Sequence, residues 1–188
     1  RSVSRGLGDV YKRQANGVVS TIDPATEDSS LKYYLAQALS IRAFDYFVLA
    51  QMYQHTYKGN ESKPCVPLIT NENANEAAAN GCARSTVQEV YDQIMSDLNK
   101  AVSLLEATDK TRGTDKRYIS KEVAYGLRAR VNLTMQNWTA AAEDAQKAIN
   151  GSGTPYSREE AGAPGFTESS DHSWMWAIVI CLLYTSPS

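Results

Sequence analysis

The chain has 188 residues, of which 43% are hydrophobic, with 19 basic against 21 acidic side chains. These proportions fit a globular protein of about one domain and exclude fibrous, collagen-like and fully disordered classes. A formal charge of -2 and a pI near 5.7 lack the basic surface that a phosphate backbone requires, so nucleic acid is not an expected partner.

Both ends of the sequence carry a motif that matches translated sequencing adapter. Residues 181–186 spell CLLYTS, which one reading frame of the transposon end TGTCTCTTATACACATCT encodes, and residues 9–14 spell DVYKRQ, which its reverse complement encodes. We therefore predict that 1–14 and 181–188 are adapter-derived and that 15–180 is a partial native domain. That domain has 166 residues, with 15 basic and 20 acidic side chains and a formal charge of -5.

The sustained apolar run at 174–184, WMWAIVICLLY, is too short for a hydrocarbon core that needs about 20 apolar residues. A membrane-spanning helix is therefore not expected. Two cysteines remain in the native part, Cys65 and Cys82. They could pair across a loop, which would indicate an exported protein, or remain unpaired thiols, and the sequence leaves both open.

The first predicted helix covers residues 31–54, which contain no Gly or Pro and are apolar on nearly every face. Such a helix must be buried by neighbours on several sides. Within it, Arg42 and Asp45 are three positions apart, and we expect them to form an internal ion pair. Residues 59–84 follow, with glycine, asparagine and two prolines, and predict a long, partly anchored loop.

The second predicted helix begins at Ser85 and runs to about Glu106. Ser85 is a plausible N-cap, and Gln88 three residues on completes a capping box. Apolar side chains recur at alternating steps of three and four, which predicts one buried stripe. Its members are Val87, Tyr91, Ile94, Leu98, Ala101 and Leu105.

Two shorter helices complete the predicted set. Ser120 is the expected N-cap of a helix from Lys121 to about Met135, which buries Ala124, Leu127 and Val131. A break at 136–137 precedes a fourth helix ended by two glycines. The residues that this helix is expected to bury are Ala141, Ala145, Ala148 and Ile149.

An internal repeat connects these helices. The segment DLNKAV, beginning at Asp97, resembles DAQKAI, beginning at Asp144, at an offset of 47 residues. Small residues at such positions let helices approach closely, and stacked helical hairpins are typical of tetratricopeptide-like arrays. The predicted fold class is therefore all-α, built from tetratricopeptide-like helical hairpins.

No catalytic, cofactor or metal site emerges from the motifs. His55 and His172 lack neighbours at metal-ligand spacing, and no glycine loop cradles a phosphate. The triad residue types at 171–173 are adjacent in sequence, whereas a catalytic triad is assembled across a fold. We therefore expect no enzyme activity, and the ligand-binding residues are left unassigned.

Aromatic residues are the alternative source of a binding site. Tyr53 and Tyr57 lie near the first loop and could stack on a sugar ring, although packing is favoured for Tyr57. Trp138, at a helix junction, is expected to fill the seam between the two hairpins.

Several runs of sequence together resemble the SusD/RagB family of Bacteroidetes outer-membrane lipoproteins. Three features carry the resemblance: Arg42-Ala43-Phe44 in the long helix, Val66-Pro67-Leu68 in the loop that follows it, and Arg84 followed by Val-x-Glu-Val-Tyr. The Ala-rich hairpin at 119–149 and Trp174-Met-Trp-Ala-Ile add to it, so that it covers 31–180.

The resemblance implies a non-catalytic protein that captures oligosaccharides for a SusC-like TonB-dependent transporter. It also implies a surface-exposed location in the outer membrane, with a lipid anchor on an N-terminal cysteine outside this sequence. No cofactor is implied. A different class remains open from the helical repeat alone, namely an intracellular tetratricopeptide adaptor that binds peptides in its groove.

Overall fold

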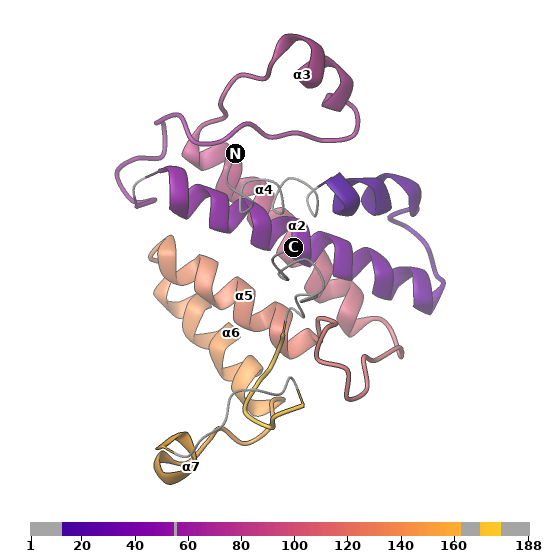
Figure 1. Ribbon diagram of the computed structural model, residues 1–188, viewed down its shortest axis with the longest axis vertical. Helices are drawn as coiled ribbons and strands as arrows, with labels where there is room; N and C mark the ends of the chain where they lie inside the picture. The colour runs from indigo at the N-terminus through magenta and orange to yellow at the C-terminus, as the bar shows by residue number, and fades with distance from the viewer. Residues whose placement is uncertain (1–12, 55, 163–169, 178–188) are drawn as a thin grey trace, which may run out of the picture.

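Every regular element in the part of the chain that the computed structural model describes, residues 13–54, 56–162 and 170–177, is a helix (Figure 1). This confirms the predicted all-α class. No helix in these ranges combines the length and apolar content needed to cross a membrane. After a helical segment at 13–21, the elements are α2 (Ser29–Tyr53), α3 (Ala74–Asn80), α4 (Val87–Glu106), α5 (Lys121–Thr134), α6 (Trp138–Asn150) and α7 (Arg158–Gly162).

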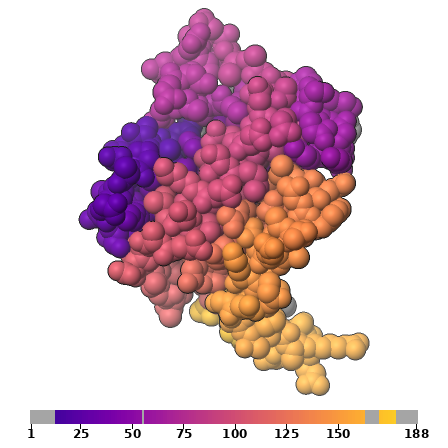
Figure 2. Space-filling view, turned by 180° about the vertical axis from the view of Figure 1, so that it is seen from behind, coloured from indigo at the N-terminus to yellow at the C-terminus, as the bar shows by residue number. Residues whose placement is uncertain are grey.

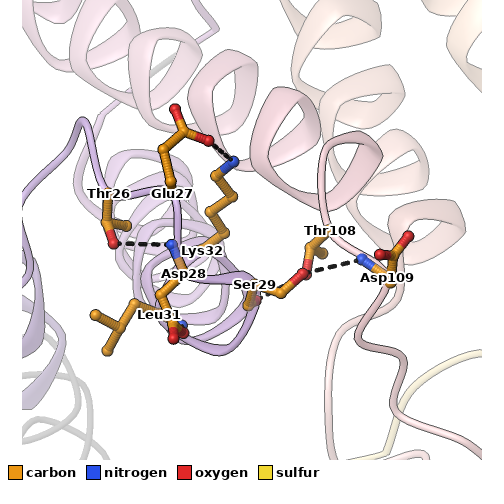
Figure 3. A network of polar contacts seen from close by, with 8 residues as sticks. All are labelled: Thr26, Glu27, Asp28, Ser29, Leu31, Lys32, Thr108 and Asp109. Carbon is orange, nitrogen blue, oxygen red and sulfur yellow. Dashed lines mark hydrogen bonds and ion pairs between the residues drawn. The ribbon is translucent and has the colours of Figure 1, made fainter.

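The start of α2 is fixed by a cap and by a contact with a distant loop. The Asp28 carboxylate accepts a hydrogen bond from the Leu31 amide at 2.8 Å, which satisfies one of the free amides of the first turn (Figure 3). The Ser29 and Thr108 hydroxyls lie 3.1 Å apart, and Thr108 also donates to the Ser29 carbonyl at 2.7 Å. The beginning of α2 is thereby tied to the loop that follows α4.

Buried side chains occur all around α2, as its sequence predicts. One side packs along α4, and part of another contacts α5. A third contact comes from the loop after α2, where the Tyr46 hydroxyl donates to the Ile69 carbonyl at 3.0 Å and accepts from the Ile69 amide at 2.9 Å. This pair of bonds anchors the loop to α2.

The loop between α2 and α4 is long and partly anchored, as predicted, and it contains α3. This helix buries none of its residues and stands off from the body of the molecule in both views (Figures 1 and 2). The loop returns to the body where Cys65 and Val66 exchange backbone hydrogen bonds with Ser85, at 2.6 and 3.2 Å.

The cap of α4 lies one residue later than predicted. Because both backbone groups of Ser85 bond to Cys65 and Val66, the helix begins after Ser85, and Thr86 is the N-cap. Glu89, rather than Gln88, completes the capping box, with its Oε2 atom 2.7 Å from the Thr86 amide. The buried stripe of α4 is confirmed at every predicted position, from Val87 to Leu105.

Helices α5 and α6 form a hairpin that lies beside the α2–α4 pair (Figure 1). Ser120 caps α5 as predicted, by accepting a bond from the Val123 amide. Gln136 ends this helix with a φ of 64°, a left-handed conformation that turns the chain into α6. A Cβ added to Gly126 would lie 3.9 Å from the Ala148 Cβ, an ordinary contact distance, so small residues of α5 and α6 face each other here.

A buried ion pair joins the two helices of the first hairpin. Arg42 on α2 donates from Nε and Nη2 to the two carboxylate oxygens of Asp97 on α4, both at 2.7 Å. The ion pair predicted between Arg42 and Asp45 is therefore wrong, because the facing helix presents a carboxylate that the guanidinium can bind with two parallel bonds. Asn16 accepts a third bond from Arg42 at 3.2 Å, and Gln93 donates to Asp97 at 2.9 Å.

The second hairpin repeats this arrangement. Arg128 on α5 donates from Nε and Nη2 to the two oxygens of Asp144 on α6, again both at 2.7 Å. Asp97 and Asp144 are the first residues of the two repeated segments. The repeat in the sequence therefore marks one structural unit, a hairpin whose two helices are joined by an arginine and an aspartate.

We expect Asp97→Ala to lower the free energy of unfolding by about 3–5 kcal/mol, because it leaves the Arg42 guanidinium buried without a counter-charge. Chemical denaturation measures the change. Glu27→Ala is the control, since the side chain that it truncates, the partner of Lys32, is 92% exposed, so that stability should change little. The double variant Arg42→Met/Asp97→Leu should recover most of the loss, and equal effects for Asp97→Ala and Glu27→Ala would contradict the interpretation.

A second prediction concerns alkaline pH. Burial raises the pKa of Tyr91 to about 12, while the tyrosines of the unfolded chain ionise near 10. Below pH 10 both states keep the proton, and between pH 10 and 12 only the unfolded state loses it, so stability falls across this window by about 2–3 kcal/mol. Denaturation of Tyr91→Phe at pH 8 and pH 11 should show a smaller fall than the unsubstituted chain, and an identical fall would refute the assignment.

Candidate functional site

The two tyrosines proposed for stacking differ in their surroundings. Tyr57 is buried, donates to Gln88 Oε1 at 2.6 Å and packs its ring 4.8 Å from that of Tyr91. Tyr53, at the end of α2, is 42% exposed. The favoured packing role of Tyr57 is confirmed, and the two rings do not form a shared exposed surface.

Trp138 does not fill a seam. The first residue of α6 is 60% exposed, and Ile149, which was expected to be buried, is 64% exposed. Together with Leu133 they line an open groove of about 430 Å³ along α5 and α6, floored by small residues such as Ala129 and Ala145. The prediction fails because a hairpin buries this face only against a further hairpin, and none is present among the described residues.

A second hollow, here called the Tyr33 pocket, has a different chemistry. It measures about 320 Å³ and lies between α2, the loop after α4 and the start of α5. Its polar and aromatic lining includes Tyr33, Lys110, Arg112, Ser120, Lys121 and Glu122.

The loop at 107–118 that forms one wall of this pocket is held at both ends. At its start, Thr108 bonds to Ser29 as described above. At its end, Gln37 on α2 donates to the Ile119 carbonyl and accepts from the Ile119 amide, both at 2.7 Å. Since Gln37 and Ile119 are both buried, these two bonds fix the loop against α2.

Cations are in excess around the Tyr33 pocket. The side chains of Lys110, Arg112 and Lys121 line it, against the single carboxylate of Glu122 in the same lining. Helix α5 begins at Lys121, so the positive end of its dipole adds to the same charge. The pocket is therefore suited to a negatively charged ligand.

Tyr33 is the aromatic member of the pocket lining, and two further tyrosine rings pack against it. Tyr33 is only 3% exposed. The centre of its ring lies 5.8 Å from that of Tyr34 and 6.4 Å from that of Tyr118. Tyr34 and Tyr118 are each 45% exposed. The Lys110 ammonium lies 4.3 Å from the centre of the Tyr34 ring, a cation–π contact.

The hydroxyl group of Tyr33 is buried and has no hydrogen-bond partner among the described residues. Burial raises the pKa of this group, and the neighbouring Tyr118 raises it further. A buried hydroxyl without a partner is costly to keep, so a ligand oxygen that bonds to it would recover that cost.

Sequence reasoning missed the residues of this pocket because none belongs to a recognised motif. The available signal was the pair of adjacent tyrosines at 33–34 together with Tyr118, which follows a loop rich in lysine and arginine. Only the fold brings residues 33 and 110 to the same place.

The residues considered for catalysis and metal binding are not assembled into a site. The Nδ1 atom of His172 lies 2.8 Å from the Thr154 carbonyl oxygen. Ser173 contacts the Asp171 carboxylate through its backbone amide, which donates a hydrogen bond at 3.2 Å. Within the described ranges no group of three His, Cys, Asp or Glu side chains is placed to hold a metal. His55 lies outside these ranges. Cys65 and Cys82 are free thiols, the first buried and the second exposed.

The family of SusD-like proteins described as "Starch-binding associating with outer membrane" matches residues 9–133. This range includes α2, α3, α4 and all but the last residue of α5, with the Arg42–Asp97 pair and most of the Tyr33 pocket. No curated protein sequence matches the chain at a significant level.

The solved structures that the chain resembles are also SusD-like proteins. A SusD-like carbohydrate-binding protein from Bacteroides vulgatus ATCC 8482 is 28% identical with a TM-score of 0.80, over 93% of this chain and 36% of that one. A SusD superfamily protein from Bacteroides thetaiotaomicron VPI-5482 is 27% identical with a TM-score of 0.66, over 80% and 33%. A laminarin-binding SusD-like protein is 26% identical with a TM-score of 0.57, over 76% and 28%.

The fold defines an all-α protein of tetratricopeptide-like hairpins. The chain belongs to the SusD-like family, because that family matches well over half of its length. It spans about a third of the length of the solved structures it resembles. This membership separates the chain from the intracellular tetratricopeptide adaptors that the helical repeat alone left open.

The exposure of Trp138 leads to a stability prediction. Trp138→Ala should lower the free energy of unfolding by less than about 1 kcal/mol, because the ring is more than half exposed. Ile94→Ala, in the fully buried stripe of α4, should cost about 2–5 kcal/mol and serves as the comparison. A cost for Trp138→Ala as large as that for Ile94→Ala would show that the ring is buried after all.

Proposed function

We propose that this protein is a non-catalytic, glycan-binding component of a SusC/SusD-type outer-membrane nutrient uptake system. The observation that carries the proposal is the family match over residues 9–133. The similarity to a carbohydrate-binding protein from Bacteroides vulgatus and to a laminarin-binding protein supports it.

The exposed aromatic rings offer a mechanism for binding. A sugar ring has an apolar face that stacks on an aromatic side chain, while its hydroxyls bond to polar groups at the edge. Tyr34 and Tyr118 are half-exposed rings beside the polar lining of the Tyr33 pocket. The hairpins provide a rigid support for such contacts, and no bond of the glycan is broken in this proposal.

The partners in this proposal are an oligosaccharide ligand and a SusC-like TonB-dependent transporter. The protein would hold the glycan at the cell surface over the transporter, attached to the outer membrane by a lipid anchor outside this sequence. We retain the division of the sequence into a family domain at 15–180 with adapter-derived ends as part of the same proposal. Residues 1–12 and 178–188 lie outside the described ranges.

A direct test measures binding and cleavage together. The chain is run by affinity electrophoresis through gels containing laminarin, amylopectin or polygalacturonate, and each polysaccharide is then assayed for new reducing ends. We expect retardation by at least one polysaccharide with no increase in reducing ends, because the protein binds without cleaving. Retardation by none of them counts against glycan binding, and new reducing ends would show a glycan-cleaving enzyme instead. Serum albumin in the same gels is the control.

A further inference from the structure

We propose that the Tyr33 pocket binds the acidic group of a charged saccharide, that is, a carboxylate or sulfate ester carried on a sugar ring. The inference rests on the proposed glycan-binding function and narrows its substrate class. Its basis is a hollow with a cationic lining and an almost fully buried tyrosine, Tyr33, whose hydroxyl has no partner among the described residues. Two half-exposed tyrosine rings lie against the ring of Tyr33.

The cations of the pocket retain donors for a ligand. The Lys110 ammonium lies 3.0 Å from the Tyr34 hydroxyl and 3.4 Å from the Ser30 hydroxyl, which leaves one of its three donors available. Arg112 uses Nη1 to bond the Tyr118 and Met175 carbonyls, and its Nε and Nη2 atoms make no hydrogen bond with the described residues. Both side chains are therefore held in place while still able to donate to an anion.

Lys121 completes the cationic side of the pocket. It is the exposed first residue of α5, where the helix dipole favours an anion, and it makes no ion pair with the described residues. The only carboxylate in the lining, that of Glu122, lies against Gly151, with its Oε1 atom 2.8 Å from where a Cβ on Gly151 would lie. The lining thus carries three cations against one carboxylate.

The remaining features select for a sugar rather than a simple anion. Tyr34 and Tyr118 present half-exposed rings on which a pyranose can stack, and they come from α2 and the loop after α4. The Tyr33 hydroxyl is buried behind the lining and has no partner among the described residues, so a ligand oxygen that reaches it would gain a hydrogen bond. The volume of about 320 Å³ lies at the lower end of the range of about 300–1,000 Å³ typical of small-molecule sites, which suits one end or one unit of a glycan.

The test is isothermal titration of the chain at low ionic strength with four probes. Digalacturonate and N-acetylglucosamine 6-sulfate distinguish a carboxylate from a sulfate ester, galactobiose is the neutral counterpart, and sodium sulfate is the anion without a sugar. Lys110→Gln and Lys121→Gln remove one cation each, and Lys100→Gln, exposed on α4 away from the pocket, is the matched control. Thermal unfolding confirms that each variant folds.

We expect one of the acidic saccharides to bind, and each pocket lysine variant to weaken its binding about tenfold while Lys100→Gln leaves it unchanged. Added salt should weaken binding further, since the contact is ionic. Tyr33→Phe should also weaken binding without loss of stability, because in the free protein its hydroxyl has no partner to lose.

Three results would overturn the inference. Equal binding of galactobiose and digalacturonate would show that the protein binds glycans without recognising the acidic group. Binding of the acidic saccharide that is unchanged in the pocket variants would show that its site lies outside the Tyr33 pocket. Sodium sulfate binding as strongly as the sulfated sugar would show an anion site without sugar recognition. Failure of all four probes would also overturn it, and the polysaccharide gels would then decide separately whether the proposed function stands.

Discussion

The structure depends on a charge that must be matched inside the protein. Arg42 has an 11% exposed side chain in the middle of α2, a helix with buried side chains on every face, and a guanidinium in that position is costly unless a carboxylate binds it. Asp97 supplies both oxygens from α4, and burial raises the pKa of this carboxyl while the hydrogen bonds from Arg42 offset part of the rise. Because the two parallel bonds require the guanidinium and the carboxylate to lie opposite each other, the pair restricts how α2 and α4 face each other.

The same constraint sets the position of the candidate binding site. Once α2 is aligned with α4, Gln37 on α2 can clamp Ile119 and Ser29 can hold Thr108, so that the intervening loop lies against α2. That loop contributes Lys110 to the pocket, while Tyr33 comes from α2. A polar loop of a dozen residues thereby becomes one wall of a hollow with a defined shape, supported on rigid helices as a binding site requires.

Much of this could be predicted from the sequence, because local patterns determine helices. The buried stripe of α4 follows from spacing alone. Contacts between distant segments could not be predicted in this way. Arg42 pairs with Asp97 on α4 rather than with a residue on its own helix. The N-cap of α4 is Thr86 rather than Ser85, because the backbone of Ser85 is hydrogen-bonded to the preceding loop. The sequence predicts that Trp138 fills the seam between the hairpins, but it is exposed, and Tyr33, for which the sequence supports no prediction, lines the pocket.

The central claim is that each hairpin is held by its own buried arginine–aspartate pair. Double-mutant cycles on the free energy of unfolding, with Arg42 and Asp97 in one cycle and Arg128 and Asp144 in another, test it most directly. The account predicts a coupling energy near the upper end of the usual range of about 0.5–3 kcal/mol within each pair, and a coupling under about 0.5 kcal/mol in a cross cycle between Arg42 and Asp144. Coupling near zero within the pairs would contradict it.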